Sequence, residues 1–317
     1  MKLFTAIGKF ALAFSVAVLI SACVTMETRI YDAGVVVERA RADVDEVRLP
    51  AGEEDLAALW REGDAGAPVL MLHGFASQKE VWLQFIRELP EERTVIALDI
   101  PGHGDSLEYG DPDYVYDVGG LARAVVALLD ELPYEQVHVV GTSLGGAISL
   151  AVATARPDKV LSVGLYNPAG VREAKTEVIR DAIAGGDNPL IARDREAMDK
   201  LIDLIFHEPP TMPWPVRSML TRYHAERADM HQRIWQDLWA ADEAIEPILQ
   251  QIKQPVLLVW GEQDRIFDVR GVDVFEAHLS DIRTFIVPEA GHTVIIEEVE
   301  DAASWYNDFL NSVETPR

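Results

Sequence analysis

The sequence predicts an α/β protein with a doubly wound, mostly parallel sheet of eight strands and an inserted set of helices. Six short runs rich in Val, Ile and Leu lack polar alternation, which is typical of parallel strands covered on both faces. Amphipathic helical stretches separate these runs, and alternation of strand and helix indicates a doubly wound sheet. Two weaker segments near the start predict an antiparallel edge, and one long stretch has no strand pattern at all.

Composition and charge exclude several classes of protein. The chain has 317 residues, with 28 Lys or Arg against 53 Asp or Glu, for a net charge of −25. This acidity argues against nucleic acid as a partner, because affinity for a duplex comes mainly from Lys and Arg at the phosphates. Apolar residues make up 49% and charged residues 26%, as in a globular protein with a sizeable core. A single cysteine excludes an intramolecular disulfide.

The N-terminal segment has the parts of a signal peptide. Lys2 and Lys9 form a positive region, and residues 10–20 form an apolar run that is too short to span a membrane. The only cysteine, Cys23, follows two small residues directly. The segment therefore resembles a bacterial lipoprotein signal over residues 1–22, with cleavage before Cys23 and lipids attached to that cysteine. An ordinary secretory signal with a chance cysteine is the alternative.

Lipidation at Cys23 would make the membrane a partner of this chain. Removing residues 1–22 deletes two lysines and no acidic residue, so the net charge of the remainder would be −27. Acyl chains, and not a charged face, would then hold the protein on a membrane, because anionic lipids repel such a body. Val24 after the cysteine, in place of Asp, resembles lipoproteins of the outer membrane. We therefore expect a lipid-anchored protein of the bacterial cell envelope, in the outer membrane.

The elements of the body follow in a regular order. Residues 23–45 are expected to form a polar, partly helical tether. Residues 46–49 and 56–61 are the two segments of the antiparallel edge. The buried strands are expected at 68–72, 94–98, 137–140, 160–165, 255–260 and 284–287, and the helices at 81–89, 117–132, 144–155, 271–279 and 298–311.

Residues 169–254 interrupt this order with helical patterns and no strand. The segment 209–215 contains too many prolines for a helix interior, and an apolar, aromatic helical pattern follows it. The chain then returns to a strand at Val256, which favours a cap inserted into one domain over a separate second domain. The predicted core accordingly comprises residues 46–168 and 255–317, with the cap at 169–254.

The strongest functional motif is Gly-x-Ser-x-Gly, formed by Gly141, Ser143 and Gly145 at the end of a strand. A serine on a sharp turn from strand to helix has a strained backbone, and the glycines leave room for that turn. The N-terminus of the following helix favours negative charge that develops near the serine. On this motif alone, Ser143 could also be a helix cap.

A strand followed by His73, Gly74 and Phe75 lies about seventy residues upstream. An acyl-transfer site needs two amide donors directed at the oxyanion. In this arrangement they would be the backbone N–H groups of Phe75 and Leu144. We expect His73 to brace the turn and not to act as a base, since it precedes the oxyanion loop.

Two further strands end in residues that could complete a catalytic triad. One is followed by Asp264 and the other by His292. A serine hydroxyl needs a base to remove its proton, and the imidazole needs a carboxylate that fixes its tautomer. Ser143, Asp264 and His292 follow the chain order expected of a triad on a doubly wound sheet, and all three lie at its carboxyl edge. Asp268 is the competing acid.

Together these motifs resemble the α/β-hydrolase family, of the capped esterase and lipase kind that includes monoacylglycerol lipases. The resemblance covers about residues 46–310 and includes the loop 99–106, Gly291 before His292, and the terminal helix after Glu297 and Glu298. It implies Ser143 as nucleophile, His292 as base and acid, and Asp264 as the residue that orients His292. The implied oxyanion hole is formed by Phe75 and Leu144, with His73, Gly74, Gly141 and Gly145 in support.

The other histidines indicate no cofactor. His103 lies in a glycine-rich loop and is expected to be structural, and His138 falls inside a strand. The histidines of the insertion form no metal-ligand pattern, and the sequence has no phosphate-binding loop. We therefore expect neither a metal nor another cofactor. The three histidines of the insertion are His207, His224 and His231.

The leading hypothesis is a serine hydrolase that cleaves carboxylic esters, with a small ester as its substrate. Trp214, Met219, Tyr223 and Trp235 suggest a hydrophobic acyl pocket, although ordinary core packing explains each of them equally well. A serine nucleophile argues against related dehalogenases and epoxide hydrolases, which use Asp at that position. Carbon–carbon bond hydrolases and perhydrolases with the same triad stay open, as does a non-catalytic binding protein.

Overall fold

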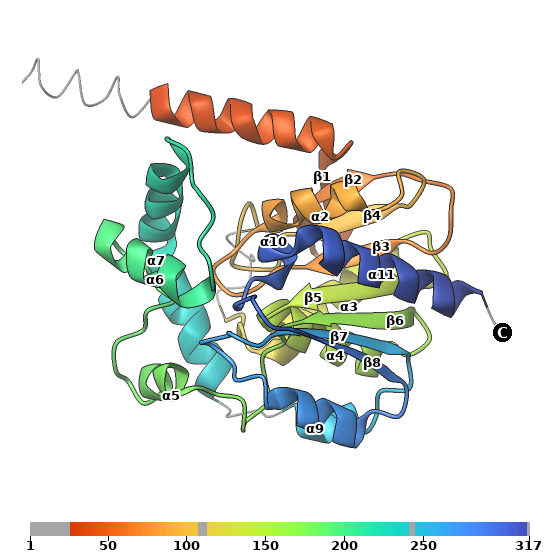
Figure 1. Cartoon of the computed structure of the whole chain (residues 1–317). Coiled ribbons are helices and arrows are strands. Elements are labelled where there is room, and N and C mark those ends of the chain that lie inside the picture. Colours follow the sequence, from red (N-terminus) through yellow and green to blue (C-terminus); the bar gives the residue numbers. More distant parts are fainter. Residues whose placement is uncertain (1–25, 107–112, 241–244, 316–317) are drawn as a thin grey trace, which may run out of the picture.

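The chain forms a mixed, mostly parallel sheet of eight strands with helices on both faces (Figure 1). The computed structural model describes residues 26–106, 113–240 and 245–315. The strand order is β1-β2-β4-β3-β5-β6-β7-β8. β2 is antiparallel to β1 and β4, and the remaining neighbours are parallel. The predicted fold class is therefore confirmed, including the antiparallel edge at the start.

The strands match the apolar runs of the sequence. Successive side chains alternate between the two faces, so that Leu70 and Leu72 join one core cluster while Val69 and Met71 join the other. Both faces are therefore apolar, which explains the missing polar alternation. The strands are β1 (Asp45–Ala51), β2 (Glu54–Arg61), β3 (Val69–Leu72), β4 (Val95–Leu98), β5 (Val137–Thr142), β6 (Val160–Tyr166), β7 (Val256–Gly261) and β8 (Ile282–Val287).

Two helical layers cover the sheet (Figure 1). The first face carries α3 (Val118–Glu131), α4 (Leu144–Ala155) and α9 (Gly271–His278). The second carries the 3-10 helix η1 (Lys79–Trp82) with α2 (Leu83–Glu88), α10 (Val294–Glu297) and α11 (Val299–Glu314). α3 begins where the Asp117 side chain accepts a hydrogen bond from the N–H of Gly120, which satisfies one of the free amides of its first turn.

In the described residues between β6 and β7, 167–240 and 245–255, four helices form in the stretch that lacks a strand pattern. They are α5 (Glu177–Ile183), α6 (Arg195–Ile205), α7 (Val216–Ala240) and α8 (Glu246–Leu249). Figure 1 shows α6 and α7 beyond the edge of the sheet at which the parallel strands end. Residues 206–215 between them form no helix, as their prolines predict.

Residues 26–41 form an additional helix, drawn red-orange at the top of Figure 1. Its first turns lie beside α7 and its end leads into β1, so it crosses from the inserted helices to the sheet. Cys23 and the predicted signal at 1–22 lie outside the described residues. Within the ranges that the structure describes, no helix is long and apolar enough to cross a membrane.

Candidate active site

The candidate site lies at the carboxyl edge of the sheet, where open α/β sheets bind ligands. Phe75 follows β3, Ser143 follows β5, and Asn167 follows β6. Asp264 and His292 come from the turns after β7 and β8. Because these strands are parallel neighbours, residues separated by more than two hundred positions converge on one place.

Ser143 occupies the sharp turn between β5 and α4. Its φ of 54° and ψ of −120° lie in a region that non-glycine residues rarely adopt, and such strain is typical of functional residues. The turn is tight enough that a Cβ on Gly141 would lie 2.1 Å from the carbonyl oxygen of Gly145. A Cβ on Gly145 would lie equally close to the carbonyl oxygen of Leu72. Both predicted glycines are therefore required by close backbone approach.

The loop after β3 passes directly in front of Ser143. A Cβ on Gly74 would come within 3.1 Å of the Ser143 Cβ, so glycine allows this approach. The backbone amides of Phe75 and Leu144 have no hydrogen-bond partner among the described residues. Two free amides beside a serine are the arrangement that an oxyanion requires.

Asp264 and His292 form a buried hydrogen-bonded pair. Nδ1 of His292 lies 2.8 Å from Oδ2 of Asp264. The backbone N–H groups of Ile266 and Phe267 donate to the other oxygen, Oδ1, at 2.7 and 3.0 Å. With Nδ1 as the donor to a fixed carboxylate, Nε2 of His292 is left without its proton and can accept one.

Ser143 and His292 line the same cavity. Among the described residues no hydrogen bond joins the two side chains. Catalytic hydrogen bonds are often longer in the absence of substrate. The structure thus joins two residues of the predicted triad directly and places the third in the same cavity.

The turn that carries His292 is held by the segment that leaves α6. The backbone N–H of His292 donates to the carbonyl of Ile205 at 2.8 Å. Glu297 accepts from the N–H of Gly291 at 2.9 Å through Oε1, and from the N–H of His207 at 2.6 Å through Oε2. Glu297 therefore connects the histidine turn with the inserted helices.

Asp268, the competing acid, lies apart from His292. Its carboxylate accepts two hydrogen bonds from the Arg270 guanidinium, at 2.8 and 2.9 Å. The hydrogen bonds from Arg270 hold the pKa of Asp268 below its usual value. These contacts describe a surface ion pair, and the geometry favours Asp264 as the partner of His292.

His73 is buried under the loop that carries Phe75. Its Nδ1 donates to the carbonyl of Gly74 at 2.8 Å, and its Nε2 accepts from the N–H of Ile100 at 3.2 Å. Burial lowers the pKa of His73 to about 4, so the ring is neutral and these two bonds define its tautomer. His73 therefore links the loop to the segment after β4, which is a bracing role.

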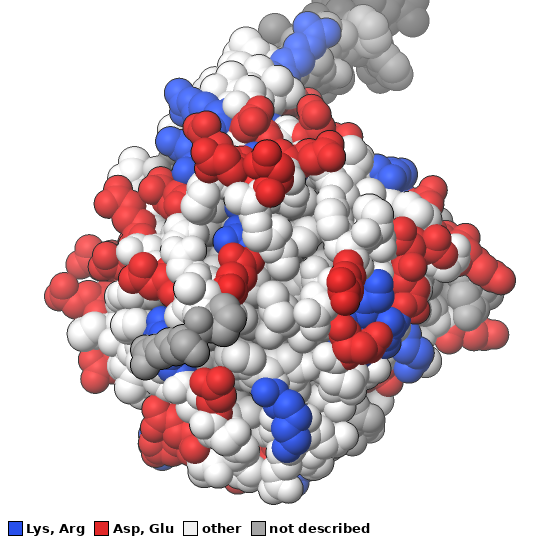
Figure 2. All heavy atoms as spheres, turned by 90° about the vertical axis from the view of Figure 1, so that its right-hand side faces the viewer, with Lys and Arg blue, Asp and Glu red and all other residues white. Residues whose placement is uncertain are grey.

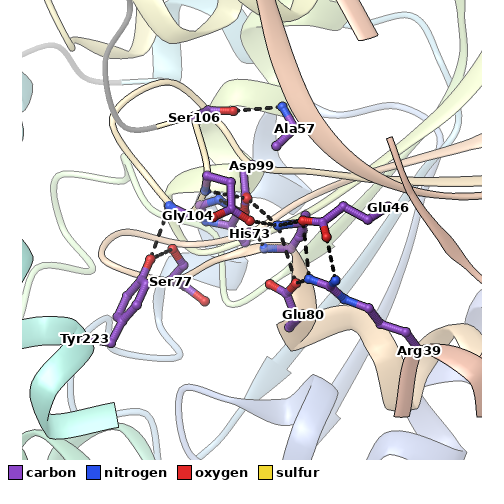
Figure 3. A network of polar contacts seen from close by, with 12 residues as sticks. Arg39, Glu46, Ala57, His73, Ser77, Glu80, Asp99, Gly104, Ser106 and Tyr223 are labelled. Atoms are coloured by element: carbon purple, nitrogen blue, oxygen red, sulfur yellow. Dashed lines mark hydrogen bonds and ion pairs between the residues drawn. The ribbon is translucent and has the colours of Figure 1, made fainter. Parts of the chain in front are cut away.

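An ion network that is buried at Lys79 and Asp99 and exposed at Asp105 lies beside the same loop (Figure 3). Nζ of Lys79 lies 2.8 Å from Oδ2 of Asp99 and 2.5 Å from Oδ2 of Asp105, and both Lys79 and Asp99 are fully buried. Tyr223 of α7 accepts from the N–H of Gly104 at 3.1 Å and donates to the carbonyl of Ser77 at 3.3 Å. The two hydrogen bonds of the Tyr223 hydroxyl thus connect α7 with the loops beside the site.

Three more histidines pack together near the site, His103 from the loop after β4 and His224 and His231 from α7. The ring centroids of His103 and His231 are 6.0 Å apart, and those of His224 and His231 are 5.7 Å apart. Burial lowers the pKa values of His103, His224 and His231 to about 3, 4 and 2. Within the described ranges, no group of three or more His, Cys, Asp or Glu side chains is arranged to hold a metal ion. His138 lies elsewhere, between Ser162 and Glu314.

An apolar cavity of about 570 Å³ leads away from Ser143 and His292. Tyr223 and Trp235 line it, as the sequence suggested, whereas Trp214 is 58% exposed and neither it nor Met219 lines the cavity. The sequence did not identify the lining from α6, from the segment after it and from the N-terminal helix. This lining includes Met198, Leu201, Ile202, Phe206, Met212 and Tyr31.

Sequence reasoning also missed Asn167. Its side-chain amide donates to Oδ2 of Asp264 at 2.8 Å and to the carbonyl of Gly291 at 3.3 Å. The available signal was its position, since Asn167 directly follows β6 at the edge where the other site residues lie.

The fold and this site agree with a comparison to known protein families. Residues 67–299 match the model of the alpha/beta hydrolase fold family, which is more than half of the chain. The chain belongs to the α/β-hydrolase family. The sequence motifs predicted this family, and the match to the family model confirms that prediction.

Lipases are among the similar members of this family. The monoacylglycerol lipase ABHD6 of Rattus norvegicus is 26% identical over 260 residues, which are 78% of this chain and 76% of that protein. Lipase 1 of Psychrobacter immobilis is 26% identical over 287 residues, 88% of each chain. The crystal structure of a membrane phospholipase A, described as a bacterial virulence factor, has a TM-score of 0.87 and 31% identity, covering 97% of this chain and 99% of its own. The chain is thus a lipase-like or esterase-like α/β hydrolase.

Proposed function

We propose that this protein is a serine hydrolase that cleaves carboxylic esters of apolar acyl groups through an acyl-enzyme. The observation that carries the proposal is the buried Asp264–His292 pair, which shares an apolar cavity with the strained residue Ser143. A hydrogen-bonded acid and base beside a serine on such a turn are the parts that acyl transfer needs.

In the proposed mechanism Ser143 Oγ attacks the ester carbonyl while Nε2 of His292 takes the hydroxyl proton. The amides of Phe75 and Leu144 donate to the oxyanion, and Asp264 stabilises the imidazolium. His292 then returns the proton to the oxygen of the leaving alcohol, and the acyl group stays on Ser143. A water molecule that loses its proton to His292 attacks the acyl-enzyme. His292 then returns this proton to Ser143 Oγ as the bond to the acyl group breaks and the acid leaves.

The cavity supports an acyl group as the part of the substrate that is bound. Its lining combines aliphatic and aromatic side chains, and such surface binds hydrocarbon by removing it from water. The names of the relatives agree with acylglycerols or phospholipids as the ester. We propose residues 169–254 as a cap over this cavity, inserted into a core of 46–168 and 255–317.

We also propose that Cys23 carries the lipids that hold the protein in the bacterial envelope, at the outer membrane. The apolar run 10–20 and the small residues before the cysteine support this location. Mass spectrometry of the N-terminal peptide from membrane fractions tests it. An unmodified Cys23 would contradict the proposal, and a Cys23→Ser variant should be uncleaved.

Replacement of Ser143 tests the catalytic proposal. Ser143→Ala should lower ester hydrolysis by several orders of magnitude, because the residues of a triad act as a unit. The matched control is Thr154→Ala, since Thr154 lies near the far end of α4 and its hydroxyl donates to the carbonyl of Leu150. Ester hydrolysis by Ser143→Ala within about tenfold of the parent rate would contradict the mechanism.

The alternatives are separated by substrate and by labelling. A panel of p-nitrophenyl esters of increasing length, monoacylglycerols and a ring-cleavage dienoic acid distinguishes ester from carbon–carbon bond hydrolysis. High turnover on the dienoic acid alone would contradict the ester proposal. Peracid formation with acetate and hydrogen peroxide in place of ester hydrolysis would indicate a perhydrolase. A fluorophosphonate that fails to label Ser143 in the folded protein would support a non-catalytic binding protein.

A further inference from the structure

The helix over residues 26–41 shows its apolar side to the outside. Met26, Ile30, Val36 and Val37 are 51%, 43%, 62% and 48% exposed, and they belong to the few large apolar side chains of the described chain that are exposed. Met26, Ile30 and Val37 fall on one face of the helix, together with Ala33, which is also exposed. A surface helix normally turns this face to the core, so the present orientation is inverted.

The opposite face of the same helix holds it to the protein through polar contacts. Arg39 forms ion pairs with Glu46, at 2.7 Å, and with Glu80 (Figure 3). At the other end, Glu27 accepts from the indole nitrogen of Trp214 at 3.1 Å, and Arg222 donates to the hydroxyl of Thr28 at 2.8 Å. These contacts hold both ends of the helix against the rest of the protein, so its apolar face is directed outward.

Trp214 extends this apolar surface onto the inserted segment. It is 58% exposed, and its hydrogen bond to Glu27 places it beside the first turn of the helix. Tryptophan with one polar contact and an exposed ring is typical of the boundary between water and lipid. The name outward face is used below for Met26, Ile30, Ala33, Val37 and Trp214.

The outward face lies on the opposite side of the helix from the cavity. Tyr31 lies on the inner side of the helix and lines the cavity that contains Ser143. Pro210, Met212 and Pro213, which precede Trp214 in the chain, line the same cavity. A molecule that reached the outward face would therefore be separated from the cavity by one helix and one extended segment.

Charge favours lipid over a second copy of this acidic protein. The chain carries 53 acidic residues, yet Asp32 is the one acidic residue among the exposed positions of 26–41, where Arg29 and Arg41 are also exposed. In Figure 2 this helix projects at the top as white and blue spheres, with a group of red side chains directly below it and others over the rest of the body. Two bodies of charge −25 repel each other, whereas a zwitterionic lipid surface does not repel either.

The segment that precedes the helix also indicates that lipid covers the outward face. Residues 1–25 directly precede Met26, and residues 10–20 of that segment form an apolar run. Whether this segment or a lipid at Cys23 attaches the protein, the first turn of the helix is the part of the described chain nearest to the attachment. We propose that the outward face lies in the headgroup region of a membrane and holds the mouth of the cavity against the lipid, so that an acyl substrate passes from the bilayer into the cavity.

This proposal goes beyond the proposed function, and it can be tested without turnover. The full chain with Cys23→Ser and Val37→Cys, labelled on its single thiol with a nitrobenzoxadiazole dye, is mixed with phosphatidylcholine vesicles. The emission should shift to the blue and be quenched by lipids that carry a doxyl group in the headgroup region. The control is Cys23→Ser with Ile286→Cys, because Ile286 in β8 is equally exposed, at 50%, and far from the helix in the fold. Its label should not respond.

Other ways of covering the outward face, or of attaching the protein, would give different results in this labelling experiment. If a second copy covered the outward face, the label at position 37 would report burial without vesicles, in a manner that depends on protein concentration. If residues 1–25 alone attached the protein, the chain would bind vesicles while this label stayed in water. Either result would overturn the proposal. Success or failure of the labelling does not depend on the proposed triad.

A kinetic experiment tests the consequence for the substrate. Ile30→Glu with Val37→Glu places two charges in the outward face and should lower hydrolysis of phospholipid or monoacylglycerol in vesicles by about tenfold or more. Hydrolysis of a soluble p-nitrophenyl ester should stay at the parent level, since neither residue lines the cavity. The matched control is Val115→Glu with Ile286→Glu, at positions 46% and 50% exposed. An equal loss on vesicles in both double variants would contradict the proposal.

Discussion

The side-chain amide of Asn167 donates a hydrogen bond to Oδ2 of Asp264, the same oxygen that lies 2.8 Å from Nδ1 of His292. The other carboxylate oxygen accepts from the N–H groups of Ile266 and Phe267. Four donors from three different segments thus define the orientation of one carboxylate. In the proposed mechanism this orientation directs Nε2 of His292 toward Ser143, so Asn167 is expected to be a positioning residue.

Replacing Asn167 should therefore slow catalysis without weakening substrate binding. Asn167 has a φ of 46°, so glycine is the substitution that keeps this backbone conformation. Asn167→Gly removes one hydrogen bond to a charged group, worth about 1.5–3 kcal/mol, and should lower kcat about tenfold to a hundredfold with little change in KM. Asp43→Gly is the matched control, because Asp43 also has a positive φ, of 53°, and is exposed away from the site. A rise in KM with unchanged kcat would contradict the positioning role.

The two candidate acids should differ strongly in their effect. Asp264→Asn leaves the shape of the site but allows the wrong tautomer of His292, and a loss of about 10⁴-fold in kcat is expected. Asp268→Asn breaks a surface pair with Arg270 and should leave kcat nearly unchanged. Steady-state kinetics with a soluble ester measures both. A large loss for Asp268→Asn and a small one for Asp264→Asn would reverse the assignment.

The buried pair of Lys79 and Asp99 should stabilise the fold mainly by avoiding an unpaired charge. Burial alone would lower the pKa of Lys79, but the carboxylates of Asp99 and Glu80 outweigh it and raise that pKa, so the ammonium group is charged. Lys79→Met leaves Asp99 buried without its partner, and the free energy of unfolding should fall by about 3–5 kcal/mol. Urea titration followed by circular dichroism measures it.

A second substitution shows whether charge causes this loss. Asp99→Asn in the Lys79→Met background removes the unpaired carboxylate but keeps an oxygen that can accept from the backbone N–H of residue 79 or of Asp105. The double variant should therefore be more stable than Lys79→Met alone. If the double variant were less stable, loss of packing and not an unpaired charge would explain the effect.

The sequence predicts the sheet well because its signals are local. Most residues of the parallel strands are apolar, and the motif residues Ser143, Asp264 and His292 lie in the turns that follow three of these strands. The carboxyl ends of neighbouring parallel strands share one edge, so strand order suffices to bring these residues together. The need for glycine at positions 74, 141 and 145 could be predicted too, because these residues form or flank the turns after the strands.

The inserted helices were less predictable because helical periodicity does not say which face meets the cavity. Of the four residues that suggested an acyl pocket, Tyr223 and Trp235 line the cavity, whereas Trp214 and Met219 do not. Further lining comes from Leu201 and Phe206 around the end of α6. Tyr31 lines the cavity from a segment expected to be a tether. Asn167 has no motif of its own. These placements depend on contacts between segments far apart in the chain, which a pattern within one segment does not contain.

Four clustered histidines, of which His224 and His231 belong to α7, predict a loss of stability in mild acid. Burial lowers the pKa of His73 to about 4, of His103 to about 3, of His224 to about 4 and of His231 to about 2, whereas an unfolded chain has histidine pKa values near 6.5. As the pH falls below about 6.5, the unfolded state binds protons that the folded state does not. The free energy of unfolding should therefore decrease, by up to about 1.4 kcal/mol per pH unit for each histidine, until the pH reaches the folded pKa values.

Urea titrations at about pH 7.5, 6.5 and 5.5 measure this decrease in a range where carboxylates contribute little. His231 is the residue to replace, because neither of its ring nitrogens has a hydrogen-bond partner in the described part of the chain. His231→Leu should raise the free energy of unfolding at about pH 5.5 relative to the parent and reduce the dependence on pH by about one quarter. A parent protein equally stable at about pH 7.5 and 5.5 would mean that these rings accept protons in the folded state. The cluster would then contain water or move with pH, and its packing against α7 would not be fixed.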